Sequence, residues 1–518
     1  MDNNHSDEGI RLLKSQMNLG KVLFSWTGVI VILLVIMVLA FLQIIGNFAH
    51  WLTGIAAGVF IFELIVVIYL VNSNMDSSAK ITWLLVIVAL PILGACLYIY
   101  SLQSFGSRAL RKATEERSKL TRESLGTRQE DLNALKAQDS QAGGTATYID
   151  NTGMYPVFTN NKVTYFPLGE LKWQALLEDM KNAKEFIFME YFIIQEGLMW
   201  GKMLEIMKQK AAEGVEIRVL YDGTNEFSTL PHSYPKKLEE IGIQAKMFSP
   251  LIPIVSTYFN YRDHRKILVI DGKVAYNGGV NLADEYINAI QKCGHWKDTA
   301  LRIEGPAVDS FTMMFLEMWH LLKGVPDAGK YIGKAESFDT KGYVIPFGDN
   351  PFDKYKVGET VYMDILYQAK NYVHITSPYL ILDDEMIAAL CSTALRGVEV
   401  KLIVPGICDG KTVGELGKTY YGRLVEAGVE VYEYTPGFIH AKMFISDDIK
   451  AVVGTINLDY RSLYHHFECG TYMYDTDCIQ DIEADFQDTL SKCHRITPEE
   501  AKKTKILGRV ARLFAPMM

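Results

Sequence analysis

The sequence predicts an α/β protein that contains two copies of one unit, preceded by membrane-spanning helices. Three observations lead to this prediction. Long uncharged apolar runs are confined to the first hundred residues. Beyond them, short β-branched runs alternate with helical patterns, which is typical of βαβ units around a mostly parallel sheet. The same order of strands then returns in the second half of the chain.

The composition excludes several classes of protein. A chain of 518 residues is too long for one ordinary domain, and 49% hydrophobic against 22% charged residues excludes a disordered chain. The net charge of −9 argues against a nucleic-acid partner bound through bulk positive charge. The 7 cysteines are odd in number and widely spaced, which excludes a secreted disulfide scaffold and agrees with a reducing compartment.

Three apolar runs, at residues 22–45, 51–71 and 81–100, follow an N-terminal segment of residues 1–21 and predict transmembrane helices. The first would be roughly 36 Å long as a helix, enough to cross a hydrocarbon layer, and is too long for a signal peptide. The second contains Glu63, which we expect to be neutral or to face another helix. The third contains Pro91, which spanning helices tolerate.

Basic residues predict the orientation of these spans. Lys80 is the only Lys or Arg between the spans, whereas seven lie between residues 101 and 128, directly after the third span: Arg108, Arg111, Lys112, Arg117, Lys119, Arg122 and Arg128. Positive residues stay on the cytoplasmic side, so the rest of the chain should be cytoplasmic. We interpret residues 101–146 as a basic linker that lies against anionic headgroups or forms a solvated helix, with a flexible stretch from Asp139.

Residues 147–342 and 343–500 are predicted to be the two repeats. The strand pattern that follows Ala183 returns after Ala369, the one at Gly214 returns at Gly397, and the one at Gly242 returns at Gly428. Such regular spacing over three elements is poorly explained by chance. We therefore expect two copies that pack about a pseudo-two-fold axis.

Each repeat carries the pattern H-x-K-x4-D-x6-G-x2-N after its third strand. Its members are His264, Lys266, Asp271, Gly278 and Asn281 in the first copy, and His440, Lys442, Asp447, Gly454 and Asn457 in the second. One match by chance is on the order of one in ten thousand. Because alternate residues of a strand share a face, the histidine and lysine of each copy should point the same way, and Arg265 the other way.

Two such motifs facing each other would form a pocket for one doubly substituted phosphate. The histidines, lysines and asparagines would meet there, and the aspartate of each motif would sit at a turn, bonded to backbone or to the lysine. A metal site is disfavoured, because lysine is not a usual ligand and no cysteine or carboxylate cluster flanks either histidine. Adjacent His465 and His466 cannot both face one site, and we interpret them as structural.

These motifs resemble those of the phospholipase D superfamily, and the arrangement with amino-terminal spans is similar to that of bacterial cardiolipin synthases. The likeness runs from about Tyr148 to the C-terminus. It includes the segments Met189-Glu-Tyr-Phe-Ile, Tyr221-Asp-Gly, Arg262-Asp-His-Arg-Lys, His295-Trp-Lys-Asp, Ile375-Thr-Ser-Pro-Tyr and Asn457-Leu-Asp-Tyr-Arg-Ser-Leu. The superfamily often has serine after the motif glycine, where this chain has Gly279 and Thr455, so the first half lacks a hydroxyl at this position that could contact phosphate.

The resemblance implies two phospholipase D-like repeats and a phosphatidyltransferase that converts two phosphatidylglycerol molecules into cardiolipin and glycerol. One histidine, by family analogy His264, would form a phosphatidyl-histidine while the other moves protons, without a metal or other cofactor. The catalytic set would comprise His264, Lys266, Asp271, His440, Lys442 and Asp447, with Asn281 and Asn457 binding phosphate. Asp298 and Glu468 lie where the resemblance places carboxylates that orient the histidines.

Other functions remain open at this point. A phospholipase D-type hydrolase differs only in using water as the acceptor, and a tethered nuclease is disfavoured by the acidic balance. A catalytically dead scaffold is disfavoured because both motifs are intact. The implied partners are phosphatidylglycerol, other membrane phospholipids and the membrane itself, with no nucleic acid; the oligomeric state and the exact acceptor lipid are left open.

Two further segments suggest contact with lipid. The first half has an apolar insertion, Ser249 to Phe259, which we interpret as a lip where acyl chains enter or as a packed lid. The tail, residues 501–518, is a basic amphipathic segment that would lie at the membrane interface or dock on the body.

Overall fold

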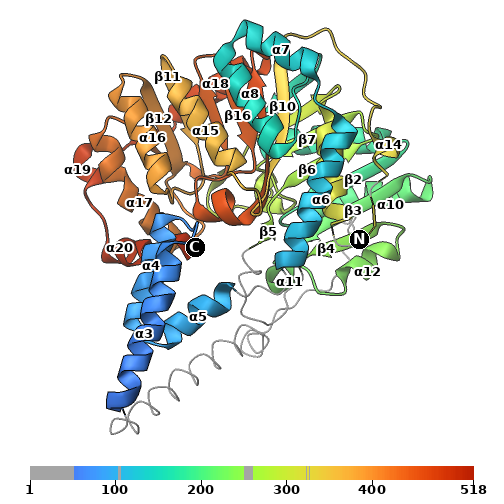
Figure 1. Ribbon diagram of the computed structural model, residues 1–518. Helices are drawn as coiled ribbons and strands as arrows, with labels where there is room; N and C mark the ends of the chain where they lie inside the picture. The colour runs from blue at the N-terminus through green and yellow to red at the C-terminus, as the bar shows by residue number, and fades with distance from the viewer. Residues whose placement is uncertain (1–51, 103–106, 250–260, 322–323, 326, 518) are drawn as a thin grey trace, which may run out of the picture.

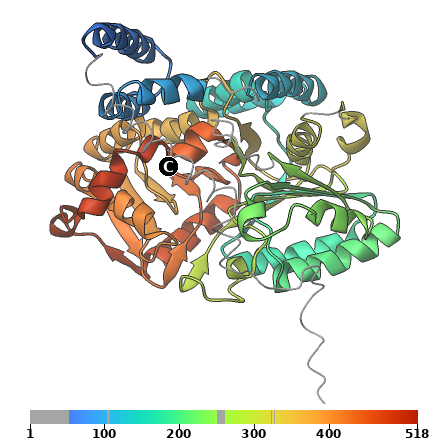
Figure 2. The same ribbon diagram turned by 90° about the horizontal axis from the view of Figure 1, so that it is seen from below.

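The computed structural model describes residues 52–102, 107–249, 261–321, 324–325 and 327–517. The body has two halves that lie side by side, and the front-end helices project from it (Figures 1 and 2). The predicted span at 22–45 and residues 250–260 of the apolar insertion lie outside the described residues.

The first half is built around a seven-stranded sheet in the order β1-β9-β7-β6-β2-β3-β4. Its strands are β1 (Lys162–Phe166), β2 (Phe186–Tyr191), β3 (Glu216–Asp222), β4 (Gln244–Phe248), β6 (Lys266–Ile270), β7 (Val274–Gly278) and β9 (Ala300–Glu304), with two short strands outside it, β5 (Arg262–Asp263) and β8 (His295–Lys297). Its helices are α9 (Gly169–Asn182), α10 (Leu198–Ala212), α11 (Asn225–Ser228), α12 (Tyr234–Glu239), a 3-10 turn at Asp284–Ile287, α13 (Val308–Trp319) and α14 (Ala328–Tyr331).

The second half repeats this order as β10-β17-β16-β15-β11-β12-β13-β18. Its strands are β10 (Tyr343–Asp349), β11 (Tyr372–Thr376), β12 (Glu399–Pro405), β13 (Glu430–Tyr434), β14 (Gly437–Ile439), β15 (Met443–Ser446), β16 (Lys450–Gly454), β17 (His466–Tyr474) and β18 (Cys493–Arg495). Its helices are α15 (Val357–Gln368), α16 (Asp384–Leu395), α17 (Lys411–Glu426), a π-helix at Arg461–His465 and α18 (Cys478–Leu490). The predicted duplication is therefore present in the topology.

The expectation of a mostly parallel sheet is wrong. Along the strand orders given above, only β2-β3-β4 and β11-β12-β13 run parallel, and the remaining neighbours are antiparallel. The physical reason is connection length: β6 and β7 are joined by a tight turn at Asp271–Lys273, which can only connect antiparallel strands.

Alternation along the strands divides the core in two. In β2, Ile187 and Met189 pack with residues of α9 and α10 in one cluster. Phe186 and Phe188 belong to a second cluster that continues through α13 into the strands of the other half. Because one apolar core serves both sheets, the halves are held together as one body.

Two strand pairs cross between the halves. β5 pairs in parallel with β17, and β8 pairs in parallel with β14. These pairs connect the segments that carry the motif histidines to the opposite repeat, and they set the geometry of the site described below.

Three helices replace the predicted linker at 101–146: α6 (Ser107–Leu125), α7 (Gln129–Gln138) and α8 (Ser140–Gly153). The flexible stretch from Asp139 is instead a capped helix, because the Asp139 carboxylate accepts hydrogen bonds from the Gln141 and Ala142 amides. Gly143 is needed for packing, since a β-carbon there would lie 2.5 Å from the Lys136 side chain. Small residues that allow helices to approach closely look like a linker in sequence.

The front end consists of α3 (Leu52–Val71), α4 (Ser77–Ala89) and α5 (Leu93–Leu102). The run 81–100 is not one continuous helix, because the chain breaks at Pro91, which cannot donate a helical hydrogen bond. Glu63 faces this break and accepts a hydrogen bond of 2.8 Å from the Ile92 amide. In the part of the chain that the structure describes, no helix has both the length and the apolar character to cross a bilayer.

The tail forms α19 (Pro498–Ala501), α20 (Ile506–Arg512) and a 3-10 turn at Ala515–Met517, and α20 docks on α17. Lys505 Nζ lies 2.6 Å from Glu415 Oε1, and Thr82 of α4 donates to the Leu513 carbonyl. The docked alternative is therefore the observed one, and the C-terminus lies beside α4 (Figure 1). Ile506 is 80% exposed, so an apolar edge of the tail still faces outward.

Candidate functional site

A cavity of about 540 Å³ lies between the two halves. It is within the range of sites that bind small molecules. Four of the predicted site residues line it: His264 and Asn281 from the first repeat, and His440 and Asn457 from the second. The structure therefore brings the two motif histidines to one cavity, as the duplicated pattern predicts.

His264 is positioned by the crossing of β5 and β17. Arg262 and Asp263 pair with His466 and Phe467, and the His264 amide donates to the Phe467 carbonyl at 2.9 Å. This register puts Glu468, the next residue of β17, beside the imidazole. His264 Nδ1 lies 2.8 Å from Glu468 Oε1 and 3.0 Å from Oε2.

His440 is held by the equivalent crossing of β8 and β14. Its amide donates to the Lys297 carbonyl at 2.7 Å, and Nδ1 lies 2.6 Å from Asp298 Oδ2. Lys442 Nζ also lies 2.8 Å from this Nδ1. A protonated Nδ1 can donate to the Asp298 carboxylate but cannot accept a hydrogen bond from the Lys442 ammonium group. Because the carboxylate favours Nδ1–H, Lys442 donates to the His440 carbonyl instead.

Counting along the chain would pair each acid with the histidine of its own repeat, and that pairing is wrong. Glu468 of the second repeat orients His264, and Asp298 of the first orients His440. The reason is that the strands leading to each histidine pair with strands of the other half. Both predicted acids do contact a motif histidine.

Burial determines the protonation of the two imidazoles. It lowers the pKa of His264 to about 3 and that of His440 to about 4, although the neighbouring carboxylates act in the opposite direction. Burial alone would raise the pKa of Glu468, but its contact with His264 brings the pKa below its usual range. Both rings are therefore neutral at pH 7, and a carboxylate on Nδ1 leaves Nε2 with a free lone pair.

The two motif lysines do not line the cavity, and each buried ammonium group donates to the carbonyl of its motif histidine. Lys266 donates to the His264 carbonyl at 2.6 Å and lies over the Phe192 ring. Burial lowers the pKa of Lys266 to about 8 and that of Lys442 to about 7. Two cations so close to losing a proton are poised to respond to an anion in the cavity.

The motif aspartates, predicted as part of the catalytic set, do not line this cavity, and they bond backbone, which is one of the two contacts expected for them. Asp271 accepts hydrogen bonds of 2.7 to 2.9 Å from the amides of Lys184, Glu185 and Phe186. Asp447 makes the same three contacts with residues 370–372. Each aspartate fastens the far end of a motif strand to the start of the neighbouring strand, so its contacts are structural.

The asparagines differ from each other. Asn281 is engaged, because Oδ1 accepts from the Ile193 amide and Nδ2 donates to the Tyr286 hydroxyl. Asn457 is 4% exposed, and its Oδ1 has no hydrogen-bond partner within the described structure. The second half thus presents the freer amide to a ligand.

The residue after each motif glycine lies against one of the two carboxylates that orient the histidines. A β-carbon on Gly279 would lie 2.1 Å from Asp298 Oδ1, so Asp298 fills the space of a side chain there. In the second half Thr455 donates to Glu468 Oε2. The hydroxyl therefore helps to hold a carboxylate.

The structural interpretation of His466 is wrong, because it lines the cavity. Its ring lies 5.4 Å from that of His264, and both ring nitrogens lack a hydrogen bond among the described residues. Other lining residues, to which the sequence analysis gave no role, are Phe192, Glu285, Tyr286, Lys292, Trp296, Tyr379, Asp409, Asp459 and Arg461. They fall outside the H-x-K pattern, but Phe192, Trp296, Tyr379, Asp459 and Arg461 lie in segments that carry the family resemblance.

Donor atoms of His264, His466 and Glu468 lie within 4.8 Å of one another, a spacing that could hold a metal ion. Glu468 is already bonded to His264 Nδ1 and to Thr455, and Lys266 lies close enough to Glu468 to lower its pKa. A metal ion bound here would compete for the Glu468 carboxylate with the His264 N–H and the Thr455 hydroxyl. The donors therefore fit the orientation of a histidine better than they fit a metal.

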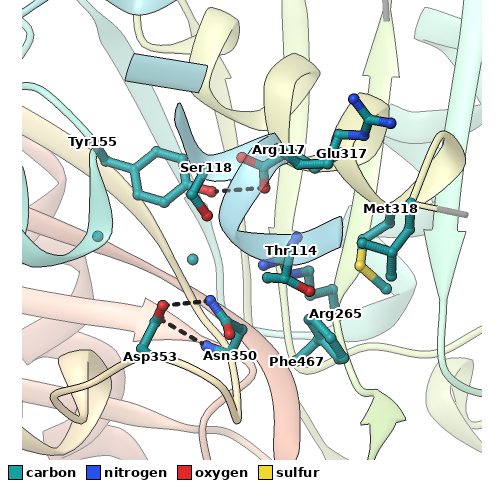
Figure 3. A pocket seen from close by; sticks show the side chains of 13 residues that line it. Thr114, Arg117, Ser118, Tyr155, Arg265, Glu317, Met318, Asn350, Asp353 and Phe467 are labelled. Carbon is teal, nitrogen blue, oxygen red and sulfur yellow. Dashed lines mark hydrogen bonds between the residues drawn. The ribbon is translucent and has the colours of Figure 1, made fainter. Parts of the chain in front are cut away.

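Arg265 points to the opposite side of its strand, as the alternation predicts, toward a second cavity (Figure 3). Its Nε donates to the Glu468 carbonyl at 3.1 Å, which braces the strand that carries this acid. Tyr155 bonds to Glu317 and Asn350 to Asp353 around this cavity. Its volume of about 20 Å³ has room for about one water and excludes a phospholipid headgroup.

Comparison with known proteins agrees with this geometry. Residues 176–319 and 362–490 match the family model described as cardiolipin synthase, PLD-like domain, and residues 61–100 match the phospholipase D-nuclease N-terminal model. An uncharacterized protein of Streptococcus mutans is 54% identical over 87% of this chain and 99% of its own length. A cardiolipin synthase of Alkalihalophilus pseudofirmus is 31% identical over 91% of this chain and 96% of its own.

A solved structure has a related fold. The phosphatidylserine synthase of Haemophilus influenzae superposes with a TM-score of 0.55 at 14% identity, covering 73% of this chain and 98% of that protein. At this identity the likeness concerns the fold alone.

Proposed function

The chain belongs to the family of cardiolipin synthases with phospholipase D-like domains, and we propose that it transfers a phosphatidyl group between two phosphatidylglycerol molecules. The products are cardiolipin and glycerol. The observation that carries the proposal is one cavity lined by two neutral histidines, each held at Nδ1 by a carboxylate from the other repeat.

In the first step, Nε2 of His264 attacks the phosphorus of the donor lipid. A P–N bond forms, the P–O bond to the headgroup breaks, and His440 supplies the proton that the departing glycerol oxygen requires. Glu468 stabilises the positive charge that develops on the His264 ring. His440 gains the proton it donates as the anionic phosphodiester approaches, because a nearby negative charge favours the imidazolium.

In the second step, a hydroxyl of the acceptor phosphatidylglycerol attacks the phosphatidyl-histidine. His440 takes the hydroxyl proton, the new P–O bond forms and the P–N bond breaks, which returns His264 to its neutral state. Lys266, Lys442, Asn281 and Asn457 would stabilise the charge on the non-bridging oxygens, most strongly in the transition states.

Hydrolysis of membrane phospholipid is the alternative function. It shares the first step and differs only in whether water or a lipid hydroxyl reaches the intermediate. The aromatic side chains of Phe192, Tyr286, Trp296 and Tyr379 line the cavity and support transfer rather than hydrolysis, since an apolar lining disfavours bulk water.

The deciding experiment incubates the purified full chain with radiolabelled phosphatidylglycerol in detergent, with and without a chelator, and separates the lipid products. We expect cardiolipin and free glycerol in both cases. Phosphatidic acid as the main product would establish the hydrolase instead. His264→Ala should abolish turnover, and His494→Ala serves as the matched control because His494 is an exposed histidine outside the cavity.

We further propose that the front end anchors the enzyme in a bacterial plasma membrane, as a multi-pass segment with the repeats on the cytoplasmic side. Exposed apolar side chains support this placement, among them Phe60 at 66%, Ile65 at 61% and Val88 at 75%. Removal of residues 1–102 should release the protein from alkali-washed membranes. Retention on the washed membrane would contradict the anchoring proposal.

A further inference from the structure

The cavity carries opposite charges at equivalent places in the two repeats. Glu285 follows Asn281 by four residues, and Arg461 follows Asn457 by the same number. Both line the cavity, one from each half. The duplication therefore places an acid at one position and a guanidinium at its counterpart.

At the acidic position, Glu285 has a hydrogen-bond partner for only one of its two carboxylate oxygens among the described residues. Glu285 is 4% exposed, and its Oε1 lies 3.0 Å from Lys292 Nζ, whereas its Oε2 has no hydrogen-bond partner among the described residues. A buried carboxylate oxygen of this kind accepts a hydrogen bond from a hydroxyl and repels a phosphate. This lobe of the cavity suits the glycerol part of a headgroup.

The basic position is open. Arg461 begins the short π-helix that leads into β17, and within the described structure it makes no side-chain hydrogen bond or ion pair. Its neighbour Asp459 accepts from the Ser462 amide at 2.8 Å and forms no ion pair with Arg461 among the described residues. Lys292, the other cation on the wall, is already paired with Glu285. An unpaired guanidinium presents a fork that matches a phosphate.

The proposed reaction brings two phosphodiesters into this cavity. The donor phosphorus must lie between the two histidines, so the acceptor phosphate needs a place of its own. The unpaired Asn457 Oδ1 lies on the same wall as Arg461 and is suited to a hydroxyl donor. On the basis of the proposed function, we propose that Arg461 binds the phosphodiester of the acceptor lipid and thereby selects a lipid hydroxyl over water.

The second step then proceeds from a held acceptor. The acceptor hydroxyl oxygen forms the new P–O bond, the P–N bond to His264 breaks, and the hydroxyl proton moves to His440. Arg461 takes no part in bond making, and its contribution is to bind and orient the second lipid.

The test compares two acceptors of the same phosphatidyl group. Wild type, Arg461→Gln and Arg461→Lys are assayed for cardiolipin formation and for exchange of phosphatidylglycerol with labelled free glycerol, which carries no phosphate. For Arg461→Gln we expect cardiolipin formation at low lipid to fall about 10- to 100-fold, through a higher half-saturating concentration, as for loss of a charge-assisted contact. Glycerol exchange should fall less than about 3-fold, because free glycerol carries no phosphate for Arg461 to bind.

Arg461→Lys should recover part of the lipid transfer, and Arg495→Gln, which removes an exposed arginine in β18, should change neither reaction. Equal losses in both reactions, or no loss, would overturn the assignment of Arg461. If the wild type exchanges glycerol but makes no cardiolipin, the proposed function itself fails. These outcomes are distinguished within one set of assays.

Discussion

His264 receives its orienting carboxylate from a residue 204 positions further along the chain, Glu468, at a distance of 2.8 Å. His440 and Asp298 show the same exchange in reverse. Each histidine therefore depends on the opposite repeat, and neither half contains a complete site. A duplicated protein with this arrangement requires its two halves to remain docked.

Removal of the Glu468 charge should therefore impair His264. We expect Glu468→Gln to lower turnover about 100-fold or more, because an amide does not stabilise the imidazolium that forms during attack. The measurement is steady-state cardiolipin formation. Glu483→Gln is a matched control, since Glu483 holds buried His374 at 3.0 Å outside the cavity, and it should leave turnover within about 3-fold. A similar loss in both variants would indicate a general effect on folding.

Loss of the second histidine should separate the two steps. In His440→Ala the intermediate on His264 lacks a base to activate the acceptor, so a labelled phosphatidyl-enzyme should form slowly and persist. It can be detected by acid quenching and peptide mapping after incubation with radiolabelled phosphatidylglycerol. Label found on His440 in the wild type would reverse the assignment of the nucleophile.

Activity should decline in mild alkali. The ammonium groups of Lys442 and Lys266 have pKa values of about 7 and about 8, and the charge that binds phosphate is lost as the pH rises through them. We expect kcat/KM to fall over this interval and the alkaline limb of kcat to lie at higher pH, since bound phosphate favours the ammonium. Lys442→Arg should move the kcat/KM limb upward, because arginine keeps its proton. An unchanged limb would remove Lys442 from phosphate binding.

The motif aspartates should matter for stability more than for chemistry. Asp271→Ala removes the acceptor of three backbone amides, and we expect a loss of about 2–4 kcal/mol in unfolding free energy. Turnover per folded molecule should stay within about 3-fold. Thermal unfolding together with activity on the folded fraction measures both. Asp475→Ala, a surface aspartate paired with Lys341, is the control for loss of charge.

Restoring the serine common in the superfamily should be harmful at one position only. Gly279→Ser would place a β-carbon 2.1 Å from Asp298 Oδ1, which displaces the acid from His440. Thr455→Ser keeps the hydroxyl that donates to Glu468. We expect at least about a 10-fold loss of turnover in the first variant and little change in the second, by the usual cost of a misplaced catalytic group. Full activity of Gly279→Ser would contradict this role of Asp298.

The sequence alone determined the duplication, the strands that carry the motifs, and the direction in which His264 and Arg265 point. These follow from the periodicity and spacing of residues along the chain. The two acids of the site, Asp298 and Glu468, were indicated only by the resemblance to the phospholipase D superfamily. Local patterns also misled in two places. The glycines near residue 143 suggested a linker but belong to a helix, where their small size serves packing, and Pro91 interrupts a run that was expected to be one continuous helix.

Only the tertiary structure decided which acid meets which histidine, that His466 and Arg461 reach the cavity, and that the motif aspartates bond backbone rather than the lysines. Such relationships depend on β5 and β14 pairing across the halves. The free energy of that pairing comes from a core shared by residues hundreds of positions apart, and no local stretch of sequence records it.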